Sequence, residues 1–255
     1  MNRPLLVSDL DNTLIHSQKH RRPGDVCVEY RKGKEQGFTS PRALDLLREV
    51  IRTGRLVPVT TRSVEQYLRI LWPDGVAPEY AVTTNGALLL WRGEIHPEWL
   101  GESQRAIAPY RAELERTLAL ATEQNRFVRC RMVDEMYVFA YCGPELDIRE
   151  AAASFAGKTA LTVIPSGRKL YFLPPSVSKG TALPRLKALL KADRVMSAGD
   201  SRIDLPMLAL SERALVPPGG LAEELPAGVA EVAGEGEPFA EFVLRTALGW
   251  LGGEG

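Results

Sequence analysis

The stretch PLLVSDLDNT, residues 4–13, combines a short apolar run with two acids at its end. Residues 4–8 have the length and composition of a buried strand in a parallel sheet. Asp9 follows this run directly, and Asp11 lies two residues further along the chain. Because α/β proteins bind ligands outside the carboxyl ends of their strands, we expect both acids to line a binding site.

Two carboxylates at this spacing repel each other unless a cation holds them. Carboxylate oxygens are the hard ligands that suit Mg²⁺. The alternative interpretation is a strand followed by an ordinary Asp-Asn turn. It explains neither the acid at the end of an apolar strand nor the second acid beyond it, so Asp9 and Asp11 indicate a metal site.

Strands alternate with helices along the chain, which favours an α/β fold with a doubly wound parallel sheet. Ser40 and Pro41 open a predicted helix that ends before Gly54. Leu44, Leu47 and Ile51 are spaced to form its buried side. The other elements predicted outside the insert are a hairpin at 25–38, strands at 56–61 and 195–200, two strands around an Asn-Gly turn at 80–91, helices at 64–72, 180–191 and 205–211, a strand at 214–218, and a frayed tail at 249–255.

The pattern changes between about residues 90 and 172, where the sequence predicts an antiparallel sheet with helices. We interpret this block as an α+β cap domain inserted into the core. The predicted core comprises residues 1–88 and 174–255, and the predicted cap comprises residues 89–173. The elements expected in the cap are helices at 102–123 and 145–156 and strands at 127–133, 136–142, 160–164 and 169–173.

Polar residues recur at the ends of the other predicted core strands. Thr60 ends the strand at 56–61, and Asp200 ends the strand at 195–200 with Asp204 four residues on. Lys179 lies just before a predicted helix. All of them are consistent with one site at the carboxyl edge of the sheet.

This order of motifs resembles the haloacid dehalogenase (HAD) superfamily. The first motif, DxDxT, is residues 9–13; the second is Thr60 in TTR, similar to the TGR of the Cof-like branch. The third is Lys179 in VSKG, and the fourth is Asp200 with Asp204 in GDSRID. TTNGA at residues 83–87 and the long insert also resemble that branch, whose members carry a C2-type cap on a Rossmann-like core.

The resemblance implies a phosphatase that hydrolyses a small phosphomonoester, such as a sugar phosphate. Asp9 would be the nucleophile that forms an aspartyl-phosphate. Asp11 would protonate the leaving alcohol and then activate water. Thr60 and Lys179 would bind the transferring phosphoryl oxygens.

The resemblance also implies a Mg²⁺ ion as cofactor. Asp200 would bind it together with the Asp9 carboxylate and the Asp11 backbone carbonyl, and Asp204 would be a further carboxylate on the metal side. The residues expected to bind substrate are Thr13, Thr61, Arg62, Asn85, Arg129, Arg131 and Lys169.

The predicted strand 127–133 alternates between apolar and basic residues, so its faces are expected to differ. The apolar face would pack on the cap helices, and the basic face is either solvated or turned towards substrate. The apolar face holds Val128, Cys130 and Met132; the other holds Phe127, Arg129 and Arg131, joined by Lys169 and Tyr171 if the register of strand 169–173 agrees.

Two positions depart from the Cof-like pattern. Ile203 stands where Asn is usual, and Thr61 stands where Gly is usual. Two alternatives to the phosphatase hypothesis remain open. One is a phosphomutase of the same superfamily, and the other is a regulatory or binding protein that keeps the fold without turnover.

Composition limits the partners of this chain of 255 residues. Lys and Arg together number 32, as do Asp and Glu, so no net charge favours nucleic acid or an anionic membrane. The longest apolar run, Met136 to Cys142, is too short to span a bilayer, and the N-terminus does not resemble a signal peptide. Three scattered cysteines are typical of a reducing compartment. We expect a cytoplasmic monomer or homodimer that acts on a small phosphorylated metabolite.

Overall fold

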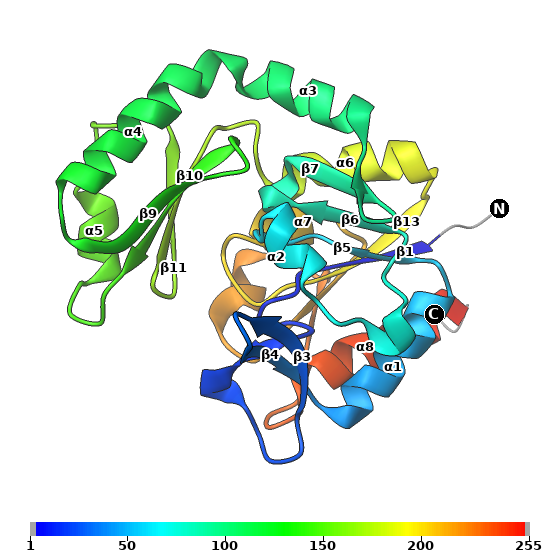
Figure 1. The fold of residues 1–255 in the computed structure, drawn as a ribbon. Helices are drawn as coiled ribbons and strands as arrows, with labels where there is room; N and C mark the ends of the chain where they lie inside the picture. Colours follow the sequence, from blue (N-terminus) through cyan, green and yellow to red (C-terminus); the bar gives the residue numbers. More distant parts are fainter. Residues whose placement is uncertain (1–3, 253–255) are drawn as a thin grey trace.

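The computed structural model describes residues 4–252, and its core is a five-stranded parallel sheet in the order β15-β14-β13-β1-β5 (Figure 1). Every neighbouring pair in this sheet is parallel. A parallel bridge between Val59 and Val82 continues the sheet towards β6. The predicted parallel α/β core is confirmed. Its five strands are β1 (Pro4–Ser8), β5 (Leu56–Pro58), β13 (Arg194–Ala198), β14 (Arg213–Val216) and β15 (Ala230–Val232), and β6 (Tyr80–Thr83) lies beyond β5.

Helices cover both faces of the core sheet, which buries both sides of β1. Leu6 lies in the cluster formed with α1 and α8. Leu5 and Val7 point to the other face and pack with α6 and α7. This arrangement explains why β1 is a continuous apolar run. The helices are α1 (Pro41–Arg52), α2 (Val64–Leu68), α6 (Lys179–Leu190), α7 (Leu205–Leu208) and α8 (Phe239–Gly252).

Helix α1 begins and ends where its sequence predicts. The Ser40 hydroxyl accepts a hydrogen bond from the Ala43 amide at 3.0 Å, and Gly54 adopts a φ of +66° beyond the last turn. Leu47 and Ile51 are buried as expected. Leu44 is only partly buried, and the rest of the buried side comes from Ala43, Leu46 and Val50.

Two small antiparallel sheets flank the core. The predicted hairpin forms β3 (Val26–Arg31) and β4 (Lys34–Thr39), and the short strand β2 (His16–Ser17) pairs with β4. On the other side, β7 (Leu88–Trp91) pairs with β6 and with β8 (Glu94–Ile95). The predicted boundary between residues 88 and 89 therefore falls inside a strand.

A second body, here called the cap, contains an antiparallel sheet in the order β11-β12-β10-β9 with α4 and α5 on one face. These helices lie on the side of the sheet away from the core (Figure 1). The predicted helix 102–123 is wrong as a single element, because a 3-10 turn containing Pro109 separates α3 from α4. The elements are α3 (Pro97–Ile107), α4 (Arg111–Glu123), β9 (Phe127–Val133), β10 (Tyr137–Cys142), α5 (Ile148–Ala153), β11 (Thr162–Ser166) and β12 (Lys169–Leu173).

The expected frayed tail is wrong for the residues that the structure describes. Gly249–Gly252 form the last turn of α8, and residues 253–255 lie outside the described part of the chain. Trp250 is 2% exposed and lies in the same cluster as Leu6. The two tail residues Trp250 and Leu251 are thus part of the core. Between residues 4 and 252, no helix is both long and apolar enough to cross a membrane.

We predict that Trp250→Ala lowers the free energy of unfolding by about 3–5 kcal/mol, because it leaves a large cavity between α8 and the sheet. Urea denaturation measures the difference. The control is Arg42→Ala on the exposed side of α1, which should change the free energy of unfolding by less than about 0.5 kcal/mol. An equal, small effect of both variants would contradict the placement of α8 in the core.

Candidate active site

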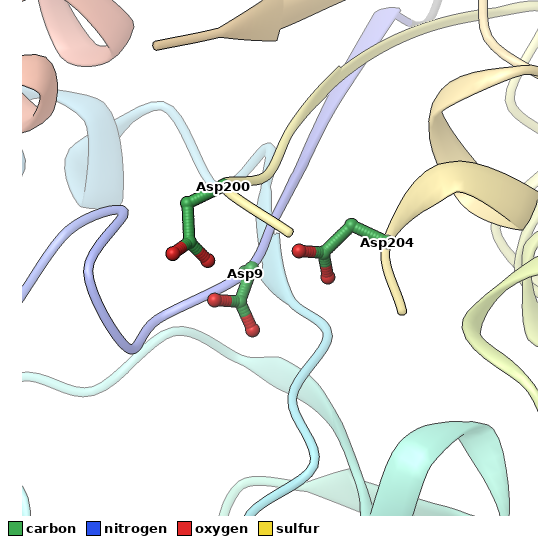
Figure 2. A group of neighbouring side chains, drawn as sticks. All are labelled: Asp9, Asp200 and Asp204. Atoms are coloured by element: carbon green, nitrogen blue, oxygen red, sulfur yellow. The ribbon is translucent and has the colours of Figure 1, made fainter. Parts of the chain in front are cut away.

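Three carboxylates meet at the carboxyl edge of the core sheet. Asp9 follows β1, Asp200 follows β13, and Asp204 immediately precedes α7. Figure 2 shows their side chains turned towards one another, and one oxygen from each lies within 4.8 Å of the others. The strand-end pattern predicted this meeting, because parallel strands deliver their carboxyl ends to one edge.

Lys179 lies between two of these carboxylates. It is the first residue of α6, and its side chain is fully buried. Its Nζ donates a hydrogen bond to Asp9 Oδ1 and another to Asp204 Oδ1, the second at 2.5 Å. Such charge-assisted bonds offset the loss of hydration that burial imposes on all three groups.

Close backbone packing holds this lysine and its partner Asp204 in place. The start of α6 lies against the turn at Gly86, where an added Cβ would come within 2.3 Å of the Ser178 carbonyl oxygen. An added Cβ at Gly199 would come within 2.6 Å of Asp204 Cβ. The other Asp204 oxygen accepts hydrogen bonds from the Ser201 amide at 3.0 Å and hydroxyl at 3.1 Å. A side chain at either position would collide with these atoms, so both positions require glycine.

The cluster carries more negative charge than Lys179 balances. Burial raises the pKa of Asp9 to about 8 against the attraction of Lys179, and the charges of Asp204 and Asp200 add to the rise. Burial and Asp204 likewise raise the pKa of Asp200 to about 6. A divalent cation would relieve this repulsion, and three hard carboxylate oxygens are a donor set that suits one. The residues present thus fit a metal ion.

Asp11 lies beside this cluster, but its carboxylate is turned to Arg62. Arg62 Nε and Nη2 donate to the two Asp11 oxygens at 3.0 and 2.7 Å. Burial alone would raise the pKa of Asp11, but the Arg62 guanidinium outweighs burial and holds this pKa at about 2. Arg62 itself is buried, and it donates to the buried Glu29 as well. Arg62 was predicted to bind substrate, but its guanidinium binds the acidic side chains of Asp11 and Glu29 in this structure.

Three smaller polar residues that were predicted to belong to the site, Thr13, Thr60 and Asn85, are buried. Thr13 is buried and donates to Asp9 Oδ2 at 3.4 Å. The Thr60 hydroxyl accepts from the Arg62 amide at 3.2 Å, and its carbonyl accepts from the Asn85 amide at 2.9 Å. Asn85 is fully buried, and within residues 4–252 its side-chain oxygen has no hydrogen-bond partner.

The helix-free face of the cap sheet is turned towards these core loops. Tyr137 donates to the Thr61 carbonyl oxygen at 2.6 Å, and the Tyr171 hydroxyl lies 3.4 Å from the Thr61 hydroxyl. Arg131 Nη2 donates to the Gln66 side chain at 2.9 Å. Three strands of the cap thus contribute side chains that contact the core.

The register of the cap sheet brings the predicted cations together. Tyr141 on β10 pairs with Arg129 on one side and Lys169 on the other. The row nearer the core contains Arg131, Phe139 and Tyr171. Tyr171, Asp11 and Asp9 together raise the pKa of Lys169 against the effect of burial. Lys169 therefore lies within electrostatic reach of Asp9 and Asp11 at the carboxyl edge of the core sheet.

One part of the predicted alternation in β9 is wrong. The pairing shifts at the end of the strand, so that Phe127 lies opposite Cys142. Phe127 then packs with the helix-side cluster, as do Cys130 and Met132. Val128 is left 67% exposed. A bulge changes which way a residue points, and the sequence alone does not reveal one.

The two departures from the Cof-like pattern both lie at the joint between core and cap. Thr61 contacts Tyr137 and Tyr171 of the cap, as described above. Ile203 is 5% exposed and belongs to an apolar cluster that also contains those two tyrosines. The side chains of Thr61 and Ile203, in place of the usual Gly and Asn, therefore pack between the cap and the core.

Two acidic residues with buried contacts were not predicted from the sequence to belong to the site. One lies between the cap and the core, and the other lies in the hairpin of the core. Asp134 lies in the turn between β9 and β10 and accepts hydrogen bonds from the Val64 amide at 3.1 Å and the Thr84 hydroxyl at 2.5 Å. Glu29 lies in β3 and is 4% exposed. The position of Asp134 in a turn between two predicted strands is a weak sequence signal for a functional residue. The local sequence around Glu29 gives no such signal.

Neither a protein-family model nor a curated protein sequence matches this chain. Solved structures do match. The sucrose-phosphatase from Synechocystis sp. PCC6803, solved with sucrose and phosphate, is 20% identical; the match covers 99% of each chain with a TM-score of 0.67. A trehalose-6-phosphate phosphatase related protein is 18% identical, with 96% of this chain and 98% of that chain covered and a TM-score of 0.54.

A third similar structure is BT1666 from Bacteroides thetaiotaomicron, described as a phosphatase of the haloalkanoate (HAD) enzyme superfamily. It is 14% identical, with 99% of this chain and 96% of that chain covered and a TM-score of 0.52. At such identities the likeness establishes the fold. The chain has the HAD fold, as the order of its motifs predicts.

We predict that a divalent cation stabilises this protein through the carboxylate cluster. A cation at a hundredfold excess over its Kd adds about 2.7 kcal/mol, which corresponds to a rise of about 5–10 °C in the thermal midpoint of a domain of this size. Titration with MgCl₂ in a calorimeter measures the rise. Asp200→Asn should abolish it, whereas Asp45→Asn on the surface of α1 should not. A rise that survives Asp200→Asn would place the cation elsewhere.

Proposed function

We propose that this protein is a Mg²⁺-dependent phosphatase that hydrolyses a small phosphomonoester, a sugar phosphate or a related metabolite. The observation that carries the proposal is the buried Lys179, which bridges Asp9 and Asp204 beside Asp200 at the carboxyl edge of the sheet. The similarity in fold to a sucrose-phosphatase and to a trehalose-6-phosphate phosphatase related protein supports a phosphorylated sugar as substrate.

In the first step, Asp9 attacks phosphorus and the bond to the leaving alcohol breaks. Thr13 and Lys179 hold the Asp9 carboxylate through its two oxygens, which orients it for attack. The positive charge of Lys179 also stabilises the negative charge that the phosphoryl oxygens carry in the transition state. The product of this step is an aspartyl-phosphate on Asp9 and the free alcohol.

Asp11 moves the protons in both steps. It donates one to the departing alcohol oxygen, and it then takes one from the water that attacks the aspartyl-phosphate. The proton taken from water in the second step restores the protonated Asp11 that the first step requires, so the protons balance over the cycle. The contact of Asp11 with Arg62 favours the ionised form, which acts as the base, and Asp11 must carry its proton against this effect in the first step. When bound, Mg²⁺ supplies charge neutralisation of the phosphoryl oxygens, and Asp9, Asp200 and Asp204 would hold it together with the Asp11 backbone carbonyl.

The cap supplies groups for the rest of the substrate. Arg129, Arg131 and Lys169 lie on the face of the cap sheet that is turned to the core, together with Tyr137, Tyr141 and Tyr171. Cations in this position suit a substrate with polar or anionic groups beyond its phosphate. The half-buried ring of Tyr141 offers apolar surface beside them.

We predict that Asp9→Asn abolishes turnover and leaves the fold intact, because an amide has the same shape but cannot form the acyl-phosphate. Release of inorganic phosphate from a generic aryl phosphate, with and without Mg²⁺, measures activity. Asp45→Asn is the matched control and should retain full activity. Activity of Asp9→Asn above a few per cent of wild type, with contaminating phosphatases excluded, would refute the mechanism.

A panel of sugar phosphates identifies the substrate and tests the cap. Arg131→Ala or Arg129→Ala should lower kcat/KM for the best substrate by about 10- to 150-fold, the value of one charge-assisted hydrogen bond. A small aryl phosphate offers these side chains no partner, so its hydrolysis should barely change. Arg149→Ala on α5 is the control. Equal losses on both substrates, or none on either, would remove these arginines from the substrate site.

A further inference from the structure

Glu29 is an acidic residue buried where the strand pattern predicts none. It is 4% exposed, and its neighbour Val28 is equally buried, although successive residues of a strand normally face opposite sides. The pairing of β3 with β4 shifts on both sides of Glu29. A β-bulge of this kind redirects a side chain. Gly37 on β4 leaves room for it, since an added Cβ there would lie 3.2 Å from Glu29 Cβ.

The redirected carboxylate binds two arginines from the segment that follows Thr60. Glu29 Oε2 accepts from Arg62 Nη1 at 2.8 Å. Its Oε1 accepts from Arg69 Nε at 3.2 Å and from Arg69 Nη2 at 3.0 Å. A carboxylate buried to this degree is stable only with such partners.

Arg62 thereby connects Glu29 to Asp11. Its Nη1 faces Glu29 and the Gln66 carbonyl oxygen, while Nε and Nη2 face Asp11. Because the guanidinium is planar and rigid, fixing one edge of the group fixes the direction of the other edge. The position of the Asp11 carboxylate therefore depends on a carboxylate in the hairpin.

The hairpin is itself attached to the same segment. The Leu71 amide donates to the Val28 carbonyl oxygen at 2.8 Å, and Glu29 forms an antiparallel bridge with Ile70. The carboxylate that orients Arg62 is thus held on a strand that is docked to the residues following α2, directly after Arg69. Side chains fixed by their surroundings keep catalytic geometry better than mobile ones do.

We propose that Glu29 is a positioning residue, which acts through Arg62 to hold Asp11 in the orientation that proton transfer requires. The proposal rests on the phosphatase function proposed above. It gives the hairpin at residues 26–39 a role in proton transfer that does not involve contact with substrate. Without the Glu29 charge, only the Gln66 carbonyl oxygen remains bonded to that edge of Arg62, so Arg62 and the Asp11 carboxylate are held less firmly.

The test compares Glu29→Gln with Glu65→Gln. Glu65 also pairs with Arg69, at 3.0 Å, but its side chain is 82% exposed and it does not touch Arg62. Both variants remove one negative charge beside the same arginine. Only Glu29→Gln changes the group that orients Arg62.

Two substrates separate proton transfer from general structural damage. An alkyl phosphate leaves as a strongly basic alkoxide and needs a proton from Asp11, whereas a dinitrophenyl phosphate has a good leaving group and does not. Glu29→Gln should lower kcat for the alkyl phosphate by about 10- to 100-fold, with a much smaller change in kcat for the dinitrophenyl phosphate and in KM for either. Glu65→Gln should match wild type on both.

Equal losses of kcat on the two substrates, or a Glu29→Gln enzyme indistinguishable from Glu65→Gln, would overturn the proposal. Arg69→Gln releases the other side of Glu29 and should shift the two substrates in the same direction by a smaller factor, so a poorly folding Glu29→Gln does not end the test. Arg69→Gln without that selectivity would also count against the proposal. A wild-type protein that hydrolyses neither phosphate would instead refute the phosphatase function itself.

Discussion

The buried contact of Lys179 with Asp9 and Asp204 is the interaction on which the rest of the site depends. Three charged groups that have lost their hydration must balance one another at short range, or burial would neutralise them. The Ser178 cap, which starts α6 at Lys179, and Gly199, which lets Asp204 approach, bring these groups within that range. The same requirement explains the fit of a cation, because one lysine cannot balance three carboxylates.

A second layer of charge controls Asp11 separately. Arg62 holds its carboxylate outside the Lys179 cluster, and Glu29 holds Arg62. Asp9 and Asp11, the proposed nucleophile and proton-transfer group, are therefore positioned by different elements. Asp9 is held by β1 and α6, and Asp11 is held by the loop after β5 and by the hairpin. The cap contacts the loop after β5, and Thr61 and Ile203 lie where the cap and the core meet.

The sequence predicted those features that follow from strand ends and helix starts. Asp9, Asp200 and Lys179 lie together because a doubly wound sheet brings these positions to one edge, and the order of the elements is enough to predict that. The direction of Phe127 and Glu29 depends on bulges, which arise from pairing with a distant strand. Trp250 was misplaced because a short, glycine-flanked segment gives little indication that it packs against the sheet.

The stereochemistry of the reaction at phosphorus tests the central claim most directly. A phosphorothioate monoester made chiral at phosphorus with two oxygen isotopes is hydrolysed in water labelled with the third isotope, and the configuration of the released inorganic thiophosphate is determined. Transfer to Asp9 followed by transfer to water inverts the configuration twice, so the account predicts overall retention. Overall inversion would mean that water attacks the substrate directly, and it would contradict an aspartyl-phosphate on Asp9.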